Sequence, residues 1–182
     1  QVGRYLTAVS VLIILWFTFR SAKYFIFWQP DAMRYLWYLF YLPMLFVPML
    51  ALLIAISLGK PDSYRLPRAT AALWLVSGTL LALVLTNLHQ FVFTFPVDAA
   101  VWSDTNHGYG FGYFAVIGWQ VACAVAALVV MIFKCRMKNG RRHLWPAIPM
   151  AVSLSYLALS YFGVQWVKAA LGDVTAFQSF MY

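Results

Sequence analysis

The sequence predicts an all-α protein whose helices form a polytopic transmembrane bundle, with five full spans and the start of a sixth. The chain of 182 residues is 64% hydrophobic and only 10% charged, and it contains no Glu. A soluble domain is about 25% charged, and a chain of this length cannot hide so much apolar surface in a core of its own. Asp, Glu, Lys and Arg are also absent from four long stretches, residues 35–59, 69–97, 105–133 and 144–167. The predicted solvent is therefore a lipid bilayer.

Each predicted span is an apolar segment of the roughly 20 residues that cross the hydrocarbon core of a membrane. The five spans are expected at residues 5–28, 33–58, 69–90, 112–133 and 144–167. A further helix is expected to open at Asp173, which can cap its first turn.

Local chemistry supports the boundaries of the second span. Asp31 is expected to be its N-cap. Gly59 follows its last turn and Pro61 prevents continuation. Pro43 and Pro48 are expected to kink it, because each proline removes a backbone donor and its ring collides with the preceding turn.

The distribution of Lys and Arg predicts which loops are cytoplasmic. Loops 59–68 and 134–143 are basic, whereas loop 90–111 has no Lys or Arg and contains two aspartates. The first two loops are therefore expected in the cytoplasm and loop 90–111 outside. The connection between the first two spans is then also outside, although Arg20, Lys23 and Arg34 near it oppose this assignment.

Counting the spans gives a further expectation. A chain that starts in the cytoplasm and crosses the membrane five times ends outside. If the protein passes a signal to the cytoplasm, a sixth helix has to cross back. The sequence at 1–182 thus reads as one transmembrane domain from which an upstream helix, the last helix and an output module are expected to be missing.

The candidate ligand-binding residues gather at the predicted outer end. Asn87, His89 and Gln90 close the third span, where Thr86, His89 and Gln90 would share a helical face. Loop 90–111 adds an alternation of Phe91, Phe93 and Phe95, which indicates extended chain, and an aromatic set of Trp102, Tyr109 and Tyr113. Arg20 adds a positive charge. The alternative interpretations are an interfacial aromatic belt for the loop and lipid phosphate contacts for Arg20 and Lys23.

Other chemistries are poorly supported by the residue pattern. His89, His107, Asp98 and Asp104 have no spacing that fixes them to one metal. Cys123 and Cys135 are expected to be free thiols. No span contains a carboxylate, and no Ser or Cys has an evident base, so we expect no catalytic residue, metal or cofactor. The basic loop 134–143 is short and membrane-bound, which disfavours nucleic acid as a partner and leaves anionic lipid open.

Three segments together resemble the N-terminal seven-transmembrane region of bacterial sensor histidine kinases. They are RYLWYLFYLPMLFVPMLALLIAISLGKPDSYRLP (34–67), LTNLHQFVFTFP (85–96) and YGFGYF (109–114). The most specific element is the polar group of Thr86, Asn87 and His89 at the outer end of a helix. Here only Leu88 separates Asn87 from His89, one residue fewer than in the commoner pattern.

The resemblance implies the sensor region of a two-component signal-transduction protein in the bacterial plasma membrane. This stretch would not be an enzyme, although the parent could be a protein histidine kinase. The expected partners are the lipid bilayer and an unknown small-molecule or lipid ligand, with a homodimer left open. The alternative is a small multi-span transporter or permease component.

Overall fold

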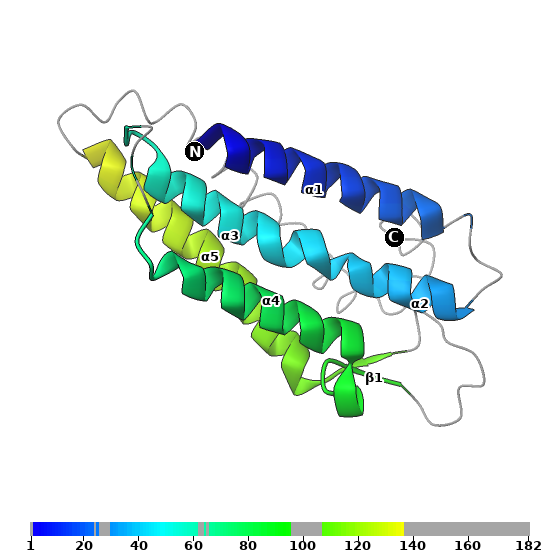
Figure 1. Ribbon diagram of the computed structural model, residues 1–182. Coiled ribbons are helices and arrows are strands. Elements are labelled where there is room, and N and C mark those ends of the chain that lie inside the picture. Colours follow the sequence, from blue (N-terminus) through cyan, green and yellow to red (C-terminus); the bar gives the residue numbers. More distant parts are fainter. Residues whose placement is uncertain are drawn as a thin grey trace, which may run out of the picture. The chain divides into compact units, whose positions relative to one another are not determined.

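The computed structural model describes residues 2–23, 25, 30–61, 64, 66–95 and 107–136. The predicted span at 144–167, the helix expected from Asp173 and the loop residue Trp102 lie outside this set. The described elements (Figure 1) are α1 (Val2–Lys23), α2 (Pro30–Leu39), α3 (Tyr41–Ser57), α4 (Thr70–Thr86), the 3-10 turn η1 (Leu88–Gln90), β1 (Phe93–Thr94), β2 (Gly108–Tyr109) and α5 (Phe111–Arg136).

Helix α1 is shifted towards the N-terminus relative to the prediction. It begins at Val2 and ends at Lys23, and the amide of Phe25 donates to the Ala22 carbonyl in a turn, at 3.0 Å. Phe25 is therefore in a turn and not in the expected continuation of this helix, and residues 24 and 26–28 lie outside the described residues. With 22 residues and a rise of about 1.5 Å per residue, α1 is long enough to cross a bilayer core of about 30 Å.

The second predicted span is interrupted at Phe40, between α2 and α3. Pro43 explains the position, because its ring collides with the carbonyl four residues earlier, at Leu39, and it offers no amide hydrogen there. Pro48 lies inside α3 without ending it. Asp31 lies within the first turn of α2 rather than at its N-cap, and it pairs with Arg34 at 3.6 Å.

The C-terminus of α3 follows the prediction closely. The helix ends at Ser57, and Gly59 has a left-handed backbone with φ 77°. Glycine adopts this conformation at little steric cost, which makes it the usual residue after a helix.

Helix α4 ends at Thr86, so the prediction of a helix to residue 90 is wrong. Asn87 caps it with φ 39° and ψ 44°, and His89 and Gln90 also have positive φ. Three left-handed residues in four positions cannot belong to an α-helix. Thr86, His89 and Gln90 consequently do not share a helical face.

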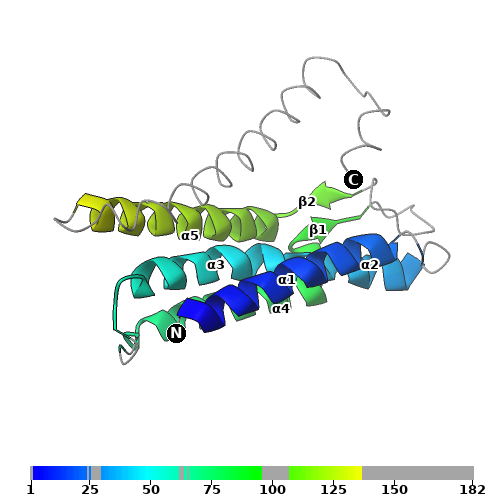
Figure 2. The ribbon, with the colours of Figure 1, turned by 90° about the horizontal axis from the view of Figure 1, so that it is seen from above.

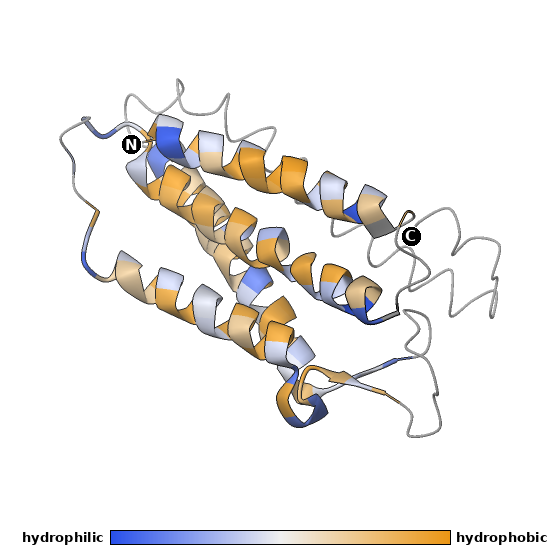
Figure 3. Ribbon diagram, turned by 45° about the vertical axis from the view of Figure 1, so that its right-hand side comes forward, coloured by the Kyte–Doolittle hydropathy of each residue, from blue (hydrophilic) through white to orange (hydrophobic). Residues whose placement is uncertain are grey.

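Helix α3 is the element on which the described helices pack. Helices α1 and α4 both contact it, and Figures 1 and 2 show α1, α4 and α5 running alongside it. Two buried clusters join these helices. One contains Met49, Leu50, Leu53 and Cys123, and the other surrounds Phe93. Figure 3 shows apolar residues along the middle of the helices and hydrophilic residues mostly near their ends.

The lengths and composition of the helices match a membrane protein. Among the residues that the structure describes, three segments are long and apolar enough to cross a bilayer, Val2–Ala22, Asp31–Ser57 and Phe111–Lys134. Helix α4 is apolar but shorter, at 17 residues. The fifth predicted span falls on residues that the structure does not describe.

A polar contact in the apolar core connects α4 to α5. The indole nitrogen of Trp119 donates to the hydroxyl of Ser77 at 2.9 Å, and that hydroxyl lies 3.5 Å from the sulfur of Met49. Ser77 is fully buried. In an apolar medium the indole N–H has no water to replace this partner.

Replacing Ser77 with Ala is expected to destabilise the protein by about 1 kcal/mol, the usual size of a hydrogen bond between membrane helices. Thermal unfolding in detergent measures the change. Trp119→Phe should have a similar effect, and the double variant should lose little more than either single variant. Strictly additive losses would contradict the coupling.

Lys134 caps the C-terminus of α3 from the end of α5. Its ammonium nitrogen lies 2.7 Å from the Ala55 carbonyl, 2.8 Å from that of Ile56 and 2.5 Å from that of Leu58. These carbonyls belong to the last turn of α3, where helical partners are missing and a cation is favoured by the helix dipole. Loop 59–68 therefore starts at the end of the bundle where Lys134 lies.

Lys134→Met is expected to lower the stability by about 2 kcal/mol, because three carbonyls lose a charged donor. The matched control is Lys60→Met, since Lys60 is exposed and its ammonium lies 5.3 Å from the Tyr64 ring. Thermal unfolding should show a loss for the first variant and almost none for the second. Equal effects would contradict the assigned role.

Candidate functional site: the Asn87 turn and its aromatic cluster

Asn87 organises the chain after α4. Its side-chain oxygen accepts hydrogen bonds from the amides of Val92 and Phe93, at 3.1 and 2.9 Å. Its side-chain nitrogen donates to the Phe93 carbonyl at 2.9 Å and to the Tyr38 hydroxyl at 3.4 Å. An amide group has two donors and two acceptor positions, so all four are used within the protein. The result is a turn that folds residues 88–93 back onto α2.

A short two-stranded ladder continues this turn. Strand β1 pairs with β2 in antiparallel register, with Phe93 opposite Tyr109. The amides of Gly110 and Gly112 donate to the carbonyls of Val92 and Phe91, both at 2.9 Å. The Phe95 amide also donates a hydrogen bond to the side-chain oxygen of Gln90, at 3.0 Å. The predicted extended chain at 91–95 is thus confirmed for β1. We call residues 91–95 and 107–112 the outer hairpin, after the side of the membrane that the charge distribution predicts for them.

Phe93 is the centre of an aromatic cluster. Its side chain is fully buried, and its ring centroid lies 4.5 Å from that of Trp37, 5.7 Å from that of Tyr38 and 5.4 Å from that of Tyr41. The Tyr38 contact is stacked, with an interplanar angle of 10°. Such pairs add stabilisation beyond the area they bury. Because Asn87 holds the Phe93 backbone, the same residue fixes this ring among its neighbours.

His107 and two tyrosines extend the cluster to α5. The His107 ring lies 4.8 Å from Trp37 and 5.2 Å from Tyr109. Tyr109 stacks on Tyr113 at 4.1 Å, and Tyr113 lies 6.3 Å from Phe93. The rings therefore form a continuous path from α2 through the outer hairpin to the first turn of α5.

Large apolar side chains are exposed around this cluster. Phe111 is 77% exposed, Leu88 59%, Tyr109 51% and Phe91 41%. They come from η1, the outer hairpin and the start of α5. One end of the bundle therefore presents exposed apolar side chains next to the polar backbone groups of the turn and the hairpin. Surface of this kind marks contact with lipid, ligand or another protein.

The predicted site residues are only partly brought together. Asn87, Tyr109 and Tyr113 belong to the turn and its cluster, whereas His89 and Gln90 lie in the exposed turn η1. Arg20 lies on a different element, α1. Trp102 lies outside the described residues.

Four residues of the cluster were missed by the sequence analysis: Trp37, Tyr38, Phe93 as a buried centre, and His107. One pattern could have indicated Trp37, together with its cluster neighbour Tyr41. Trp37 and Tyr41 are four residues apart near the predicted outer end of a span, which places two rings on one face. Nothing in the sequence indicates that His107 joins them, since that contact depends on the hairpin.

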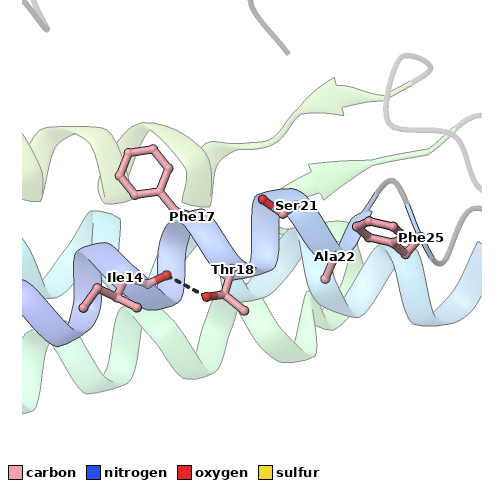
Figure 4. A pocket seen from close by; sticks show the side chains of 6 residues that line it. All are labelled: Ile14, Phe17, Thr18, Ser21, Ala22 and Phe25. Carbon is pink, nitrogen blue, oxygen red and sulfur yellow. Dashed lines mark hydrogen bonds between the residues drawn. The ribbon is translucent and has the colours of Figure 1, made fainter.

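A separate open groove runs along α1. It is lined by Ile14, Phe17, Thr18, Ser21, Ala22 and Phe25 (Figure 4). These positions recur at helical spacing and form one apolar face, on which the Thr18 hydroxyl donates to the Ile14 carbonyl at 2.9 Å. The groove contains none of the predicted site residues. In the described part of the chain, no three His, Cys, Asp or Glu side chains gather as they would around a metal.

The comparisons with known proteins identify the family. A family model described as the N-terminal 7TM region of histidine kinase matches residues 1–177. No curated protein and no solved structure matches the chain. The match covers nearly the whole sequence, and the apolar helices agree with it. The chain therefore belongs to the family of N-terminal seven-transmembrane regions of histidine kinases, and it is a membrane-embedded sensor region of a multi-pass protein rather than a catalytic domain.

Proposed function

We propose that this sensor region perceives an extracytoplasmic or membrane-borne apolar ligand at the end of the bundle formed by the Asn87 turn and the outer hairpin. The observation that carries the proposal is the combination of a fixed scaffold with exposed aromatic surface. Asn87 makes four hydrogen bonds under the hairpin, while Tyr109 and Phe111 remain at least half exposed above it. A rigid apolar surface with polar neighbours is typical of a ligand site.

The residues divide into two roles. Tyr109 would form an apolar wall, and His89 and Gln90 in η1 would offer hydrogen bonds from an exposed position. Asn87 would act by holding the turn, because its amide is already saturated, and Tyr113 by supporting Tyr109 from α5. Arg20 and Trp102 stay predicted ligand contacts, as a charge and a second wall.

The contacts at the two ends of α5 suggest how ligand binding would be transmitted through the protein. Tyr109 stacks on Tyr113 in the first turn of α5, and Lys134 at the other end of α5 holds the last turn of α3. If α5 can adopt two positions in the protein, a ligand that binds more tightly to the protein in one of them raises the population of that conformation. The coupling would run along α5 to the end of the bundle where Lys134 lies, which is the end predicted to be cytoplasmic.

Thermal unfolding of the chain in detergent, titrated with phosphatidylglycerol as an apolar anionic probe and with an uncharged diacylglycerol, tests the ligand site. We expect a rise in melting temperature for the wild-type chain, and for Tyr109→Ala a requirement for about tenfold more lipid, equivalent to about 1.4 kcal/mol. Leu75→Ala is the matched control, since Leu75 is a 70% exposed apolar residue on α4. Identical titrations for both variants would overturn the site.

The proposal places loop 90–111 outside a bacterial plasma membrane and loops 59–68 and 134–143 in the cytoplasm. Single cysteines at Thr105 and Asn139, in a chain whose Cys123 and Cys135 are replaced by Ser, test this in intact cells. A membrane-impermeant thiol reagent should modify the first and spare the second. The reverse pattern would show that the orientation is inverted and that the site faces the cytosol.

Family membership favours signal input over the transporter alternative. A readout of phosphorylation in a polypeptide that joins this region to a histidine kinase module, reconstituted in nanodiscs with the same lipids, would separate the two. A homodimer also stays a proposal, and cross-linking in these nanodiscs would detect it. Lipid-dependent transport without any change in phosphorylation would contradict the sensor role.

A further inference from the structure

Two side chains of α2 carry buried hydrogen-bond donors that the fold does not use. Arg34 and Tyr38 are four residues apart in this helix, so they lie on one face with about 5–6 Å between their Cβ atoms. The Nε atom of Arg34 is buried without a hydrogen-bond partner in the described part of the chain. Tyr38 is 3% exposed, and its hydroxyl oxygen accepts a bond from the Asn87 side chain at 3.4 Å. Among the described residues, that hydroxyl finds no acceptor for its own proton.

Two such donors beside a guanidinium charge indicate a place for an acceptor oxygen that the chain itself does not supply. Buried donors without acceptors are rare, because each has lost its bonds to water. The contacts that Arg34 does make leave most of its five N–H donors available. Asp31 lies 3.6 Å away with its side chain 85% exposed, and the Tyr35 ring centroid lies 5.4 Å from Cζ. Since an exposed ion pair contributes little, the guanidinium can still bind a second acid.

We propose that Arg34 and Tyr38 form an anion site, and that the ligand of this sensor region is an amphiphile whose acidic head, a carboxylate or a phosphate, binds there. Arg34 would supply the charge and its N–H donors, and Tyr38 its O–H. Hydrogen bonds from a guanidinium to such oxygens are among the strongest in proteins. One third of the Arg34 side chain is exposed, so an acidic head can reach the guanidinium from outside the bundle, and rotation of that group turns Nε towards it.

Tyr38 connects the anion site to the proposed apolar wall. Its ring stacks on Phe93 with centroids 5.7 Å apart, and its hydroxyl is bonded to Asn87, which holds the turn. Phe93 in turn pairs with Tyr109 across the ladder. One ligand could therefore place its acidic head at Arg34 and its apolar body against Tyr109. The role of the apolar body rests on the proposed function, whereas the anion site can be tested separately from it.

Thermal unfolding of the whole chain in detergent tests the anion site with phosphatidylglycerol, oleate, an uncharged diacylglycerol and inorganic phosphate. In the wild-type chain, the two anionic lipids should raise the melting temperature at lower concentrations than the diacylglycerol. Arg34→Gln should require about tenfold more of either anionic lipid and leave the diacylglycerol titration unchanged. Tyr38→Phe keeps the ring and should require about threefold more. A response to inorganic phosphate as strong as that to the lipids would support the anion site and exclude a lipid body as part of the ligand.

Asp31→Asn removes a competing carboxylate, so it should lower the required concentration of anionic lipid by about threefold, an effect that a purely structural Arg34 would not produce. Arg68→Gln is the matched control, since Arg68 is an exposed arginine just before α4, and it should titrate as the wild type. If Arg34→Gln does not fold, Arg34→Lys replaces it, with an expected loss of about threefold.

Three results would overturn the anion site. They are a wild-type chain that does not distinguish the anionic lipids from the diacylglycerol, an Arg34 variant whose titrations are unchanged, and a variant that loses anionic and uncharged lipid equally. A loss confined to anionic lipid in the Arg34 variant, combined with no effect of Tyr109→Ala, would instead count against the proposed apolar wall and leave the anion site standing.

Discussion

Replacing Asn87 with Ala is expected to unfold the outer hairpin and to lower the stability of the chain by about 3–5 kcal/mol. The change removes the partner of two amides, those of Val92 and Phe93, and of the Phe93 carbonyl. A buried polar group left without a partner costs about 1–3 kcal/mol. Ala also adopts the left-handed backbone of this position less readily than Asn, at about 1 kcal/mol or more. Thermal unfolding and hydrogen exchange at Val92 and Phe93 measure the loss.

Two further variants separate the causes of this loss. Asn87→Gly allows the left-handed backbone but lacks the side-chain hydrogen bonds. Relative to Asn87→Ala, it should therefore regain only the smaller part of the lost stability, the part that comes from the backbone conformation. Thr86→Ala is the neighbouring control, because the Thr86 hydroxyl bonds only within α4, to the carbonyls of Ala82 and Leu83. If Asn87→Ala is no more destabilising than Thr86→Ala, the turn does not depend on this amide.

Replacing Gly110 with Ala is expected to separate the outer hairpin from the turn, with a loss of about 2–4 kcal/mol. A Cβ atom at this position would collide with the carbonyl oxygen of Phe91, and it would lie 2.9 Å from the carbonyl carbon of Phe91 and 3.1 Å from the Gln90 oxygen. These are backbone atoms, which cannot rotate away as a side chain can. The Gly110 amide bond to Val92 would then lengthen or break. Thermal unfolding and exchange at this amide would show it.

Glycines in the helices provide the control for this prediction. A Cβ atom at Gly118 on α5 or at Gly78 on α4 would meet no atom within 4 Å. Substitution by Ala there should be neutral or slightly stabilising, within about 1 kcal/mol, because Ala is the better helix former. Gly110→Ala that behaves like these helical variants would show that the hairpin has room to adjust.

The sequence was most informative where a single physical requirement dominates. Crossing a bilayer requires long apolar segments, and the absence of charge from 105–133 predicted α5 to within a few residues of Phe111–Arg136. Gly59 predicted the end of α3 because few residues adopt its backbone at low cost. The family resemblance drawn from 34–67, 85–96 and 109–114 was confirmed by the match over 1–177.

The sequence was least informative where two opposing local effects act on the same segment, one that favours continuing a helix and one that favours ending it. Both prolines of the second span were expected to kink it. Pro43 coincides with a break at Phe40, and Pro48 lies inside α3 without ending it. The segment at 87–90 has helical neighbours on its N-terminal side, and hydropathy alone continues the helix. The side chain of Asn87 ends it instead, because its three bonds to Val92 and Phe93 require a reversal of the chain.

The sequence by itself determined that this protein lies in a membrane, that its fold is helical and that aromatic residues concentrate between α4 and α5. These properties follow from composition and from short-range periodicity, which each segment carries independently of the others. Only the tertiary structure decided that Asn87 is a scaffold with saturated hydrogen bonds, that Phe93 is buried between α2 and α3 residues and that His107, rather than His89, joins the aromatic cluster. Those assignments depend on contacts between residues up to about seventy positions apart, and such contacts form only when the hairpin closes over α2.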